Sequence, residues 1–150
     1  MKIALTYAKK GMNKKEGGPF GACIVKGNKI VAAACNQVLK HNDATCHAEI
    51  NAIRQASLKI SDFDLSGHVI YTTTEPCPMC FSAIHWARLK TVTYSTVIAD
   101  VKRLGFNELT ISNPLMKRWG KSPVKLRRVK SDACKALLAE WAGLNNKKTY

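Results

Sequence analysis

Long apolar runs are absent from this 150-residue sequence. No stretch approaches the roughly 20 apolar residues that a membrane-spanning helix needs. The first ten residues, MKIALTYAKK, reach lysine too early for the apolar core of a secretory signal. We therefore expect a cytoplasmic protein without a membrane association.

Acidic residues are scarce. Ten Asp and Glu stand against 24 Lys and Arg, which gives a formal net charge of +14. Such a surplus attracts anionic partners, nucleic acid in particular. Seven of these cations fall between residues 117 and 130, where Trp119 is the only aromatic residue. Because bases stack on aromatic side chains, this segment does not look like a base-binding platform. Nucleic acid is therefore a weaker expectation than a small-molecule substrate.

Linkers, repeats and low-complexity tracts are also lacking, and the length is typical of one domain, residues 1–150. The six cysteines do not indicate a disulfide framework in a chain without a secretory signal. Cys23, Cys35 and Cys134 have apolar neighbours and are expected in the core. Cys46 has both a structural and a functional interpretation.

Two short apolar segments, residues 20–26 and 29–35, flank Gly27-Asn28 and predict a hairpin. Strand and helix patterns then alternate along the chain. We expect helices over 1–10, 47–59, 77–87 and 131–144, with further strands over 68–73, 91–96 and 123–129; Gly11 is expected to end the first helix. This order predicts an α/β fold with three α/β/α layers. A mixed central sheet of about five strands would carry helices on both faces, with parallel strands joined by right-handed crossovers.

Two segments carry the chemistry: CHAEINAIR, residues 46–54, and EPCPMC, residues 75–80. They supply His47, Cys77 and Cys80, one ligand fewer than a closed tetrahedral zinc site needs, so a position remains for water. Glu49 lies two residues past His47 and is the expected proton carrier. The order His-x-Glu followed by Pro-Cys-x-x-Cys is the signature of zinc-dependent base deaminases. A closed structural zinc site and a dithiol redox pair are the alternatives, and neither explains both segments together.

The surrounding residues resemble the bacterial guanine deaminase family over nearly the whole chain. The resemblance rests on residues 17–22 (GGPFGA), Asn36, residues 76–80 (PCPMC), residues 83–88 (AIHWAR), residues 105–108 (GFNE) and the terminal NKKTY. It implies a cytidine deaminase-like fold with one Zn²⁺ per chain. The implied reaction converts guanine and water to xanthine and ammonia.

The same resemblance implies a set of residues around the base. Phe20 and Trp86 would be apolar walls, and Asn36 a purine-binding amide able to donate and accept at once. Ala48 would also line the pocket, and Glu108 would be a second catalytic carboxylate that contacts the base. Tyr150 would cross to a partner subunit and close its pocket, which implies a homodimer with exchanged C-terminal segments.

Other functions remain open at this point. A tRNA adenosine deaminase would use the basic surface to hold RNA and would produce inosine. Other free amino-purines and amino-triazines are further candidate substrates. A catalytically silent binding protein on the same scaffold is disfavoured, because His47, Glu49, Cys77 and Cys80 are all present.

Overall fold

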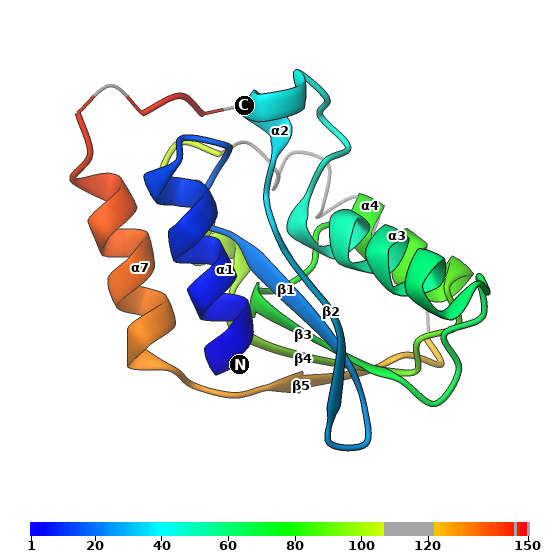
Figure 1. The fold of residues 1–150 in the computed structure, drawn as a ribbon. Coiled ribbons are helices and arrows are strands. Elements are labelled where there is room, and N and C mark those ends of the chain that lie inside the picture. The colour runs from blue at the N-terminus through cyan, green and yellow to red at the C-terminus, as the bar shows by residue number, and fades with distance from the viewer. Residues whose placement is uncertain (107–121, 146, 150) are drawn as a thin grey trace.

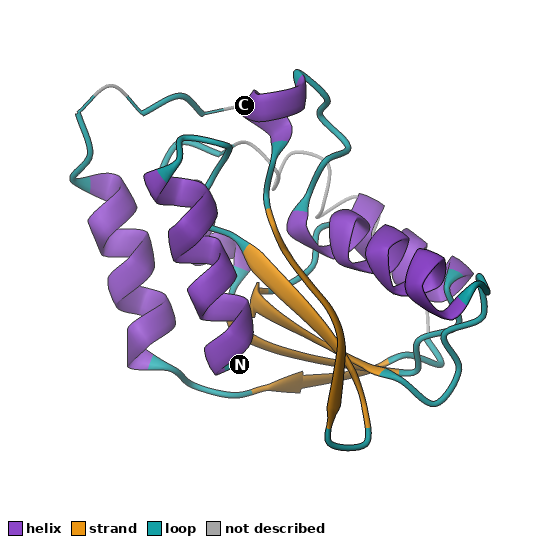
Figure 2. Cartoon of the chain, in the orientation of Figure 1, coloured by secondary structure: helices purple, strands orange, loops and turns teal. Residues whose placement is uncertain are grey.

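A five-stranded mixed sheet lies between two pairs of helices in the computed structural model, which describes residues 1–106, 122–145 and 147–149 (Figures 1 and 2). The strand order is β2-β1-β3-β4-β5. The strands are β1 (Gly21–Lys26), β2 (Lys29–Cys35), β3 (Val69–Thr74), β4 (Thr91–Thr96) and β5 (Lys125–Arg128). The helices are α1 (Lys2–Asn13), α2 (Val38–His41), α3 (Ala48–Ile60), α4 (Pro78–Trp86), α5 (Ile98–Lys102) and α7 (Asp132–Ala142).

The pairing of the strands confirms the mixed sheet. β1 pairs antiparallel with β2 through the Gly27-Asn28 turn, and it also pairs antiparallel with β3. β3, β4 and β5 are parallel. β2 and β3 therefore run in the same direction, as a strand-helix-strand connection requires, but β1 lies between them. The crossover helix α3 contacts both β2 and β1.

The two helix pairs cover opposite faces of the sheet. α1 and α7 lie side by side on one face, and α3 and α4 cover the other (Figure 1). Beneath α3 and α4 is an aliphatic core that includes Ile24, Ile70 and Val92. On the α1–α7 side, the ring of Phe106 contacts the rings of Phe20 and Trp141, with centroid distances of 5.1 and 6.0 Å. The described helices are all too short or too polar to cross a lipid bilayer.

Gly11 does not end the first helix, and this prediction was wrong. α1 continues through Gly11 to Asn13. A Cβ atom on Gly11 would lie 2.7 Å from the Cβ and Sγ atoms of Cys35. Glycine therefore stands here because the helix packs closely against the end of β2. A further helix, α5, begins at Ile98, shortly after the end of β4.

Candidate active site

Three potential metal ligands meet where α3 and α4 begin. His47 is the N-cap residue of α3, Cys77 is the N-cap residue of α4, and Cys80 lies in the first turn of α4. One ligand atom from each lies within 4.8 Å of the others. The Nδ1 atom of His47 is 3.6 Å from the Sγ atom of Cys77 and 3.5 Å from that of Cys80.

Local sequence explains why these side chains converge. An N-cap residue has an extended backbone, and His47 and Cys77 have ψ angles of 157° and 168°. Pro78 begins α4, where its fixed φ suits the helix and its missing N–H costs no hydrogen bond. The positive end of a helix dipole stabilises a thiolate, so both cysteines lie where the thiolate form is favoured.

The thiol groups of Cys77 and Cys80 shift each other's pKa in opposite directions. A hydrogen bond from Cys80 lowers the pKa of Cys77 to about 4, although burial opposes this and His47 adds to it. The same interaction, together with burial, raises the pKa of Cys80. A bound divalent cation would hold both sulfur atoms as thiolates. One imidazole and two thiolates suit Zn²⁺, and among the described residues no fourth ligand joins this group.

Glu49 is the carboxyl group beside this cluster. It lies in the first turn of α3, is only 8% exposed, and its Oε2 atom accepts a hydrogen bond from the Cys80 thiol at 3.5 Å. Burial raises the pKa of Glu49 to about 7, although the nearby His47 opposes the shift. A carboxyl group that titrates near neutral pH is suited to both accept and donate protons.

Asn36 is a fully buried amide that follows β2. Its Oδ1 atom accepts a hydrogen bond from the backbone N–H of Val38 at 3.2 Å, whereas its Nδ2 atom has no hydrogen-bond partner among the residues that the structure describes. Because the Val38 N–H requires an acceptor, the amide is oriented with Nδ2 as its free group. Its backbone N–H donates to the carbonyl of Phe20 at 3.0 Å, which ties Asn36 to the half-buried Phe20. The structure thus leaves Asn36 a donor for a ligand, and its oxygen is already engaged.

Comparison with known proteins decides the family. The "Cytidine and deoxycytidylate deaminase zinc-binding region" family matches residues 1–96, which contain all three ligands and Glu49. The chain belongs to this deaminase family. It is 38% identical to guanine deaminase of Bacillus subtilis over 150 residues, covering 100% of this chain and 96% of that protein. A solved structure of Bacillus subtilis guanine deaminase matches 99% of this chain and 95% of that one, with a TM-score of 0.72 and 38% identity.

Two further proteins that are similar to this chain have different ligands or substrates in their names. A structure solved with 2,6-diaminopurine has a TM-score of 0.81 and 27% identity, and the match covers 97% of this chain and 80% of that one. A tRNA-specific adenosine deaminase of Buchnera aphidicola is 39% identical over 108 residues. That match covers 71% of this chain and 70% of the relative.

Not all expected pocket residues of this deaminase meet at the ligand cluster. Ala48 lies between His47 and Glu49 as the first residue of α3, is buried, and has a backbone N–H without an intrahelical partner. Trp86 ends α4, nine residues past Cys77 and about 13 Å away along the helix axis. It is 83% exposed, so the structure does not place Trp86 at the cluster of its own chain. Glu108 and Tyr150 lie outside the described residues.

Asn51 is a supporting residue that sequence reasoning missed. Its Nδ2 group donates to the carbonyl oxygens of Cys35 and Cys46, at 3.1 and 3.2 Å. It therefore holds the end of β2 against the residue before His47. The sequence contained a signal for this role, because Asn51 is a polar residue one turn after His47, on the helix face that carries Ala48 and Ala52. A polar side chain on a buried face needs hydrogen-bond partners. Cys46 also has a structural contact, because its thiol donates to Asp43 at 3.2 Å.

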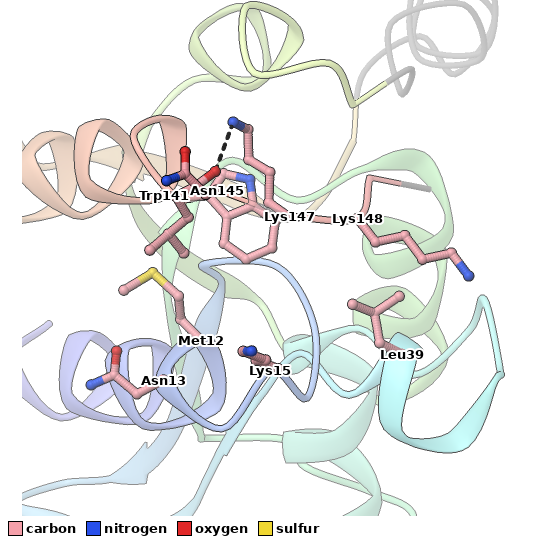
Figure 3. A pocket seen from close by; sticks show the side chains of 9 residues that line it. Met12, Asn13, Lys15, Leu39, Trp141, Asn145, Lys147 and Lys148 are labelled. Atoms are coloured by element: carbon pink, nitrogen blue, oxygen red, sulfur yellow. Dashed lines mark hydrogen bonds between the residues drawn. The ribbon is translucent and has the colours of Figure 1, made fainter.

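A separate cavity of about 290 Å³ opens between the ends of α1 and α7 (Figure 3). Trp141 and Met12 form part of its wall, and Lys15, Lys147 and Lys148 also line it. Lys147 donates to the carbonyl of Leu144, as the dashed line shows, and also to that of Ala142. None of the described residues that line this cavity belongs to the cluster of potential zinc ligands, so the cavity is distinct from the deaminase site.

Proposed function

We propose that this protein is a guanine deaminase, a hydrolase of cyclic amidine C–N bonds that converts guanine and water to xanthine and ammonia. The observation that carries the proposal is the three-ligand cluster with the buried carboxyl of Glu49 beside it. The substrate is supported by the similarity to a guanine deaminase over the full chain. A ligand group of one imidazole and two thiolates suits one Zn²⁺ per chain.

The reaction needs a nucleophile and a route for protons. When bound, zinc acts as a Lewis acid that lowers the pKa of water towards about 7. Glu49 takes the proton that the attacking water gives up and delivers protons to a ring nitrogen and to the leaving 2-amino group. Its short distance from Cys80 puts it next to the ligand set, and its raised pKa suits both steps.

Base recognition uses the other buried groups. Guanine presents O6 and N7 as acceptors, and the free Nδ2 group of Asn36 is a matching donor. Phe20 provides an apolar edge, and Ala48 provides a small surface next to the ligands. A base without an acceptor for Asn36 leaves a buried donor unpaired, which lowers its transition-state binding. Glu108 is proposed as a second carboxylate at the base.

Incubation of the zinc-loaded protein with guanine tests this function. We expect loss of the guanine absorbance and release of ammonia and xanthine in equal amounts. Free adenine, cytosine, other amino-purines, amino-triazines and tRNA are the comparison substrates. Zinc-loaded, folded protein without turnover of guanine would contradict the proposal.

Homodimerisation through the outer face of α3 and α4 is part of the proposal. This face exposes Trp86, Phe63 and Leu58, and a groove of about 330 Å³ runs between Phe63, Trp86 and α3. Clustered exposed apolar side chains are typical of protein interfaces. A second copy of the chain buries the same residues on both partners, as a two-fold interface requires.

Exchange of the C-terminal segments is a separate part of the proposal, in which Tyr150 closes the partner's pocket. The described part of the tail lies against its own chain, since Lys147 binds carbonyl groups at the end of α7 and Thr149 lies near Gly105. Deletion of residues 146–150 should preserve bound zinc and lower turnover of guanine, because the pocket loses its cover. Mixed dimers, in which one chain lacks residues 146–150 and the other carries Asn36→Ala, test which pocket the tail closes. If the tail acts in trans, the tail of the Asn36→Ala chain closes the pocket of the truncated chain and turnover is retained. If the tail acts in cis, neither pocket is complete and turnover is lost. Wild-type kinetics in the truncated protein would refute a closing role.

The chain is further proposed to be a single deaminase domain in the cytoplasm. Strands from the beginning, middle and end of the chain belong to one sheet, since β5 pairs with β4 and β1 pairs with β3. All six cysteines are free thiols, which is usual in a reducing compartment.

A tRNA adenosine deaminase is the second candidate function. The net charge of +14 and the exposed basic strand β5 favour it. This activity predicts inosine in tRNA and an RNA affinity that falls steeply with salt. The similarity to the Buchnera aphidicola tRNA deaminase extends over 71% of the chain, in contrast to full coverage by a guanine deaminase. Guanine is therefore the preferred substrate.

A further inference from the structure

The carboxylate of Glu16 bridges the two residues that flank Asn36. Its Oε2 atom accepts hydrogen bonds from the Nε2 group of Gln37 at 2.8 Å and from the Cys35 thiol at 3.5 Å. Its Oε1 atom accepts a hydrogen bond from Lys40 at 3.3 Å. Both immediate neighbours of Asn36 are thus held by a single side chain from a distant part of the sequence.

The backbone of Glu16 strengthens this connection. Its carbonyl accepts the N–H of Lys40 at 3.0 Å, and its own N–H donates to Gly11 at 2.9 Å. The segment between α1 and β1 is therefore fixed to the segment that carries Asn36. The carboxylate is suited to this role because it is ionised at neutral pH. Burial raises the pKa of Glu16, but hydrogen bonds from Gln37, Lys40 and Cys35 outweigh it, so that the net shift is downward.

Gly17, the next residue, packs directly on the amide of Asn36. A Cβ atom built on Gly17 would lie 2.1 Å from the Oδ1 atom of Asn36, a distance that no real side chain tolerates. The oxygen side of the amide is therefore confined between Gly17 and the Val38 N–H, while Nδ2 remains free. A movement of Glu16 would change both the position of Gly17 and the backbone on either side of Asn36.

We propose that Glu16 is a positioning residue for base recognition, because it fixes the Asn36 amide through Cys35, Gln37 and the adjacent Gly17. This inference rests on the proposed function for its kinetic consequences. Glu16 does not contact the zinc ligands in the structure, and its effect on the base passes through Asn36. Its removal should therefore weaken binding of the base more than it slows the chemical step.

The kinetic test uses Glu16→Gln, which preserves size and removes the charge. Because loss of the charge weakens the hydrogen bonds that Glu16 accepts, we expect kcat/KM for guanine to fall roughly tenfold or more, mainly through a higher KM. Glu16→Asp, which retains the carboxylate, should restore part of the loss. Glu140→Gln is the matched control, because Glu140 is an exposed carboxylate whose ion pair with Lys9 is long, at 3.9 Å.

A double-mutant cycle separates positioning from general stability. If Glu16 acts through Asn36, Glu16→Gln should cause no further change in KM once Asn36 is replaced by alanine. Additive effects on KM in the double variant would overturn the proposal. Should Glu16→Gln not fold, Gln37→Met removes the 2.8 Å hydrogen bond and leaves the carboxylate in place, and the same cycle applies.

A measurement without substrate makes this inference independent of the identity of the base. The side-chain amide signals of Asn36 in ¹H–¹⁵N NMR spectra are assigned by their loss in Asn36→Ala. We expect these signals to shift or broaden in zinc-loaded Glu16→Gln and to remain unchanged in Glu140→Gln. Unchanged Asn36 signals in Glu16→Gln would overturn the positioning role, whereas missing turnover in the wild-type protein would contradict only the choice of guanine.

Discussion

The two ends of the α3–α4 helix pair have opposite characters. At their N-terminal ends, Cys77, Cys80 and Glu49 are buried polar groups in a connected cluster. At and just beyond their C-terminal ends, Leu58, Phe63 and Trp86 are apolar and exposed. The same two helices thus have a cluster of potential metal ligands at one end and exposed apolar side chains at the other.

Helix polarity explains part of this contrast. Unpaired N–H groups and the positive dipole end favour thiolates and carboxylates where a helix begins. The opposite end favours cations, and Lys59 and Arg88 are found there. Arg88 also lies over the ring of Phe63, 5.1 Å from its centroid. Chemistry and association can therefore be changed separately, which the following variants exploit.

Loss of a metal ligand should have the largest effect. Cys77→Ala is expected to remove zinc, abolish turnover and lower Tm together, because metal binding is coupled to folding. Metal analysis and calorimetry provide the measurements. Cys134→Ala, which removes a buried thiol in α7, is the control and should retain zinc. A Cys77 variant with full metal content would remove this cysteine from the ligand set.

Glu49→Gln should have the next largest effect, confined to catalysis. Removal of a general acid–base group typically lowers kcat by about 10²- to 10⁴-fold. Zinc content should stay at the wild-type level, because the carboxyl group is not part of the ligand cluster. Steady-state kinetics and metal analysis on the same sample check both points. A kcat within a few-fold of wild type would assign the proton transfer to another residue.

A variant at the opposite end should affect association and spare the metal. Trp86→Ser is expected to weaken the dimer by about 30-fold, the equivalent of a 2 kcal/mol interface residue. Sedimentation measures the dissociation constant, and Ile30→Ser, at an exposed apolar position in the hairpin, is the control. If Trp86→Ser instead raised KM for guanine and left the molecular mass in sedimentation unchanged, Trp86 would be a wall of the substrate pocket, as the family resemblance implied.

The smallest effect is expected for the exposed ion pair at the same end, between Asp64 and Arg88 at 2.5 Å. Hydrogen bonds from Ser66, and then from Arg88, lower the pKa of Asp64 to about 2. A carboxyl whose folded pKa is depressed stabilises the fold above its unfolded pKa and loses this effect as the pH falls. Asp64→Asn should therefore lower Tm slightly at pH 6, and the difference should shrink as the pH falls below about 4. A difference that is independent of pH would show that the charge is not the cause.

The residues of the potential metal site were predictable because each half of the cluster follows from local rules. Cys77 and Cys80 share one helix turn, Pro78 marks its start, and His47 begins a second helix before Glu49. The hairpin was predictable for the same reason, since Gly27-Asn28 marks the turn between two short apolar segments. The end of α1 was not predictable, because the sequence does not distinguish a glycine that packs against a neighbouring element from a glycine that ends a helix.

The sequence by itself therefore predicted the cluster of His47, Cys77 and Cys80, the carboxyl group of Glu49 beside it and the α/β class, because each is marked by residues a few positions apart in the chain. Only the tertiary structure decided that Glu16 holds both neighbours of Asn36, and that Asn51 joins the end of β2 to the residue before His47. These features depend on segments that are distant in the chain and meet only when the sheet and its helices pack. No helical or strand periodicity specifies such contacts, because each is fixed by hydrogen bonds between elements rather than within one.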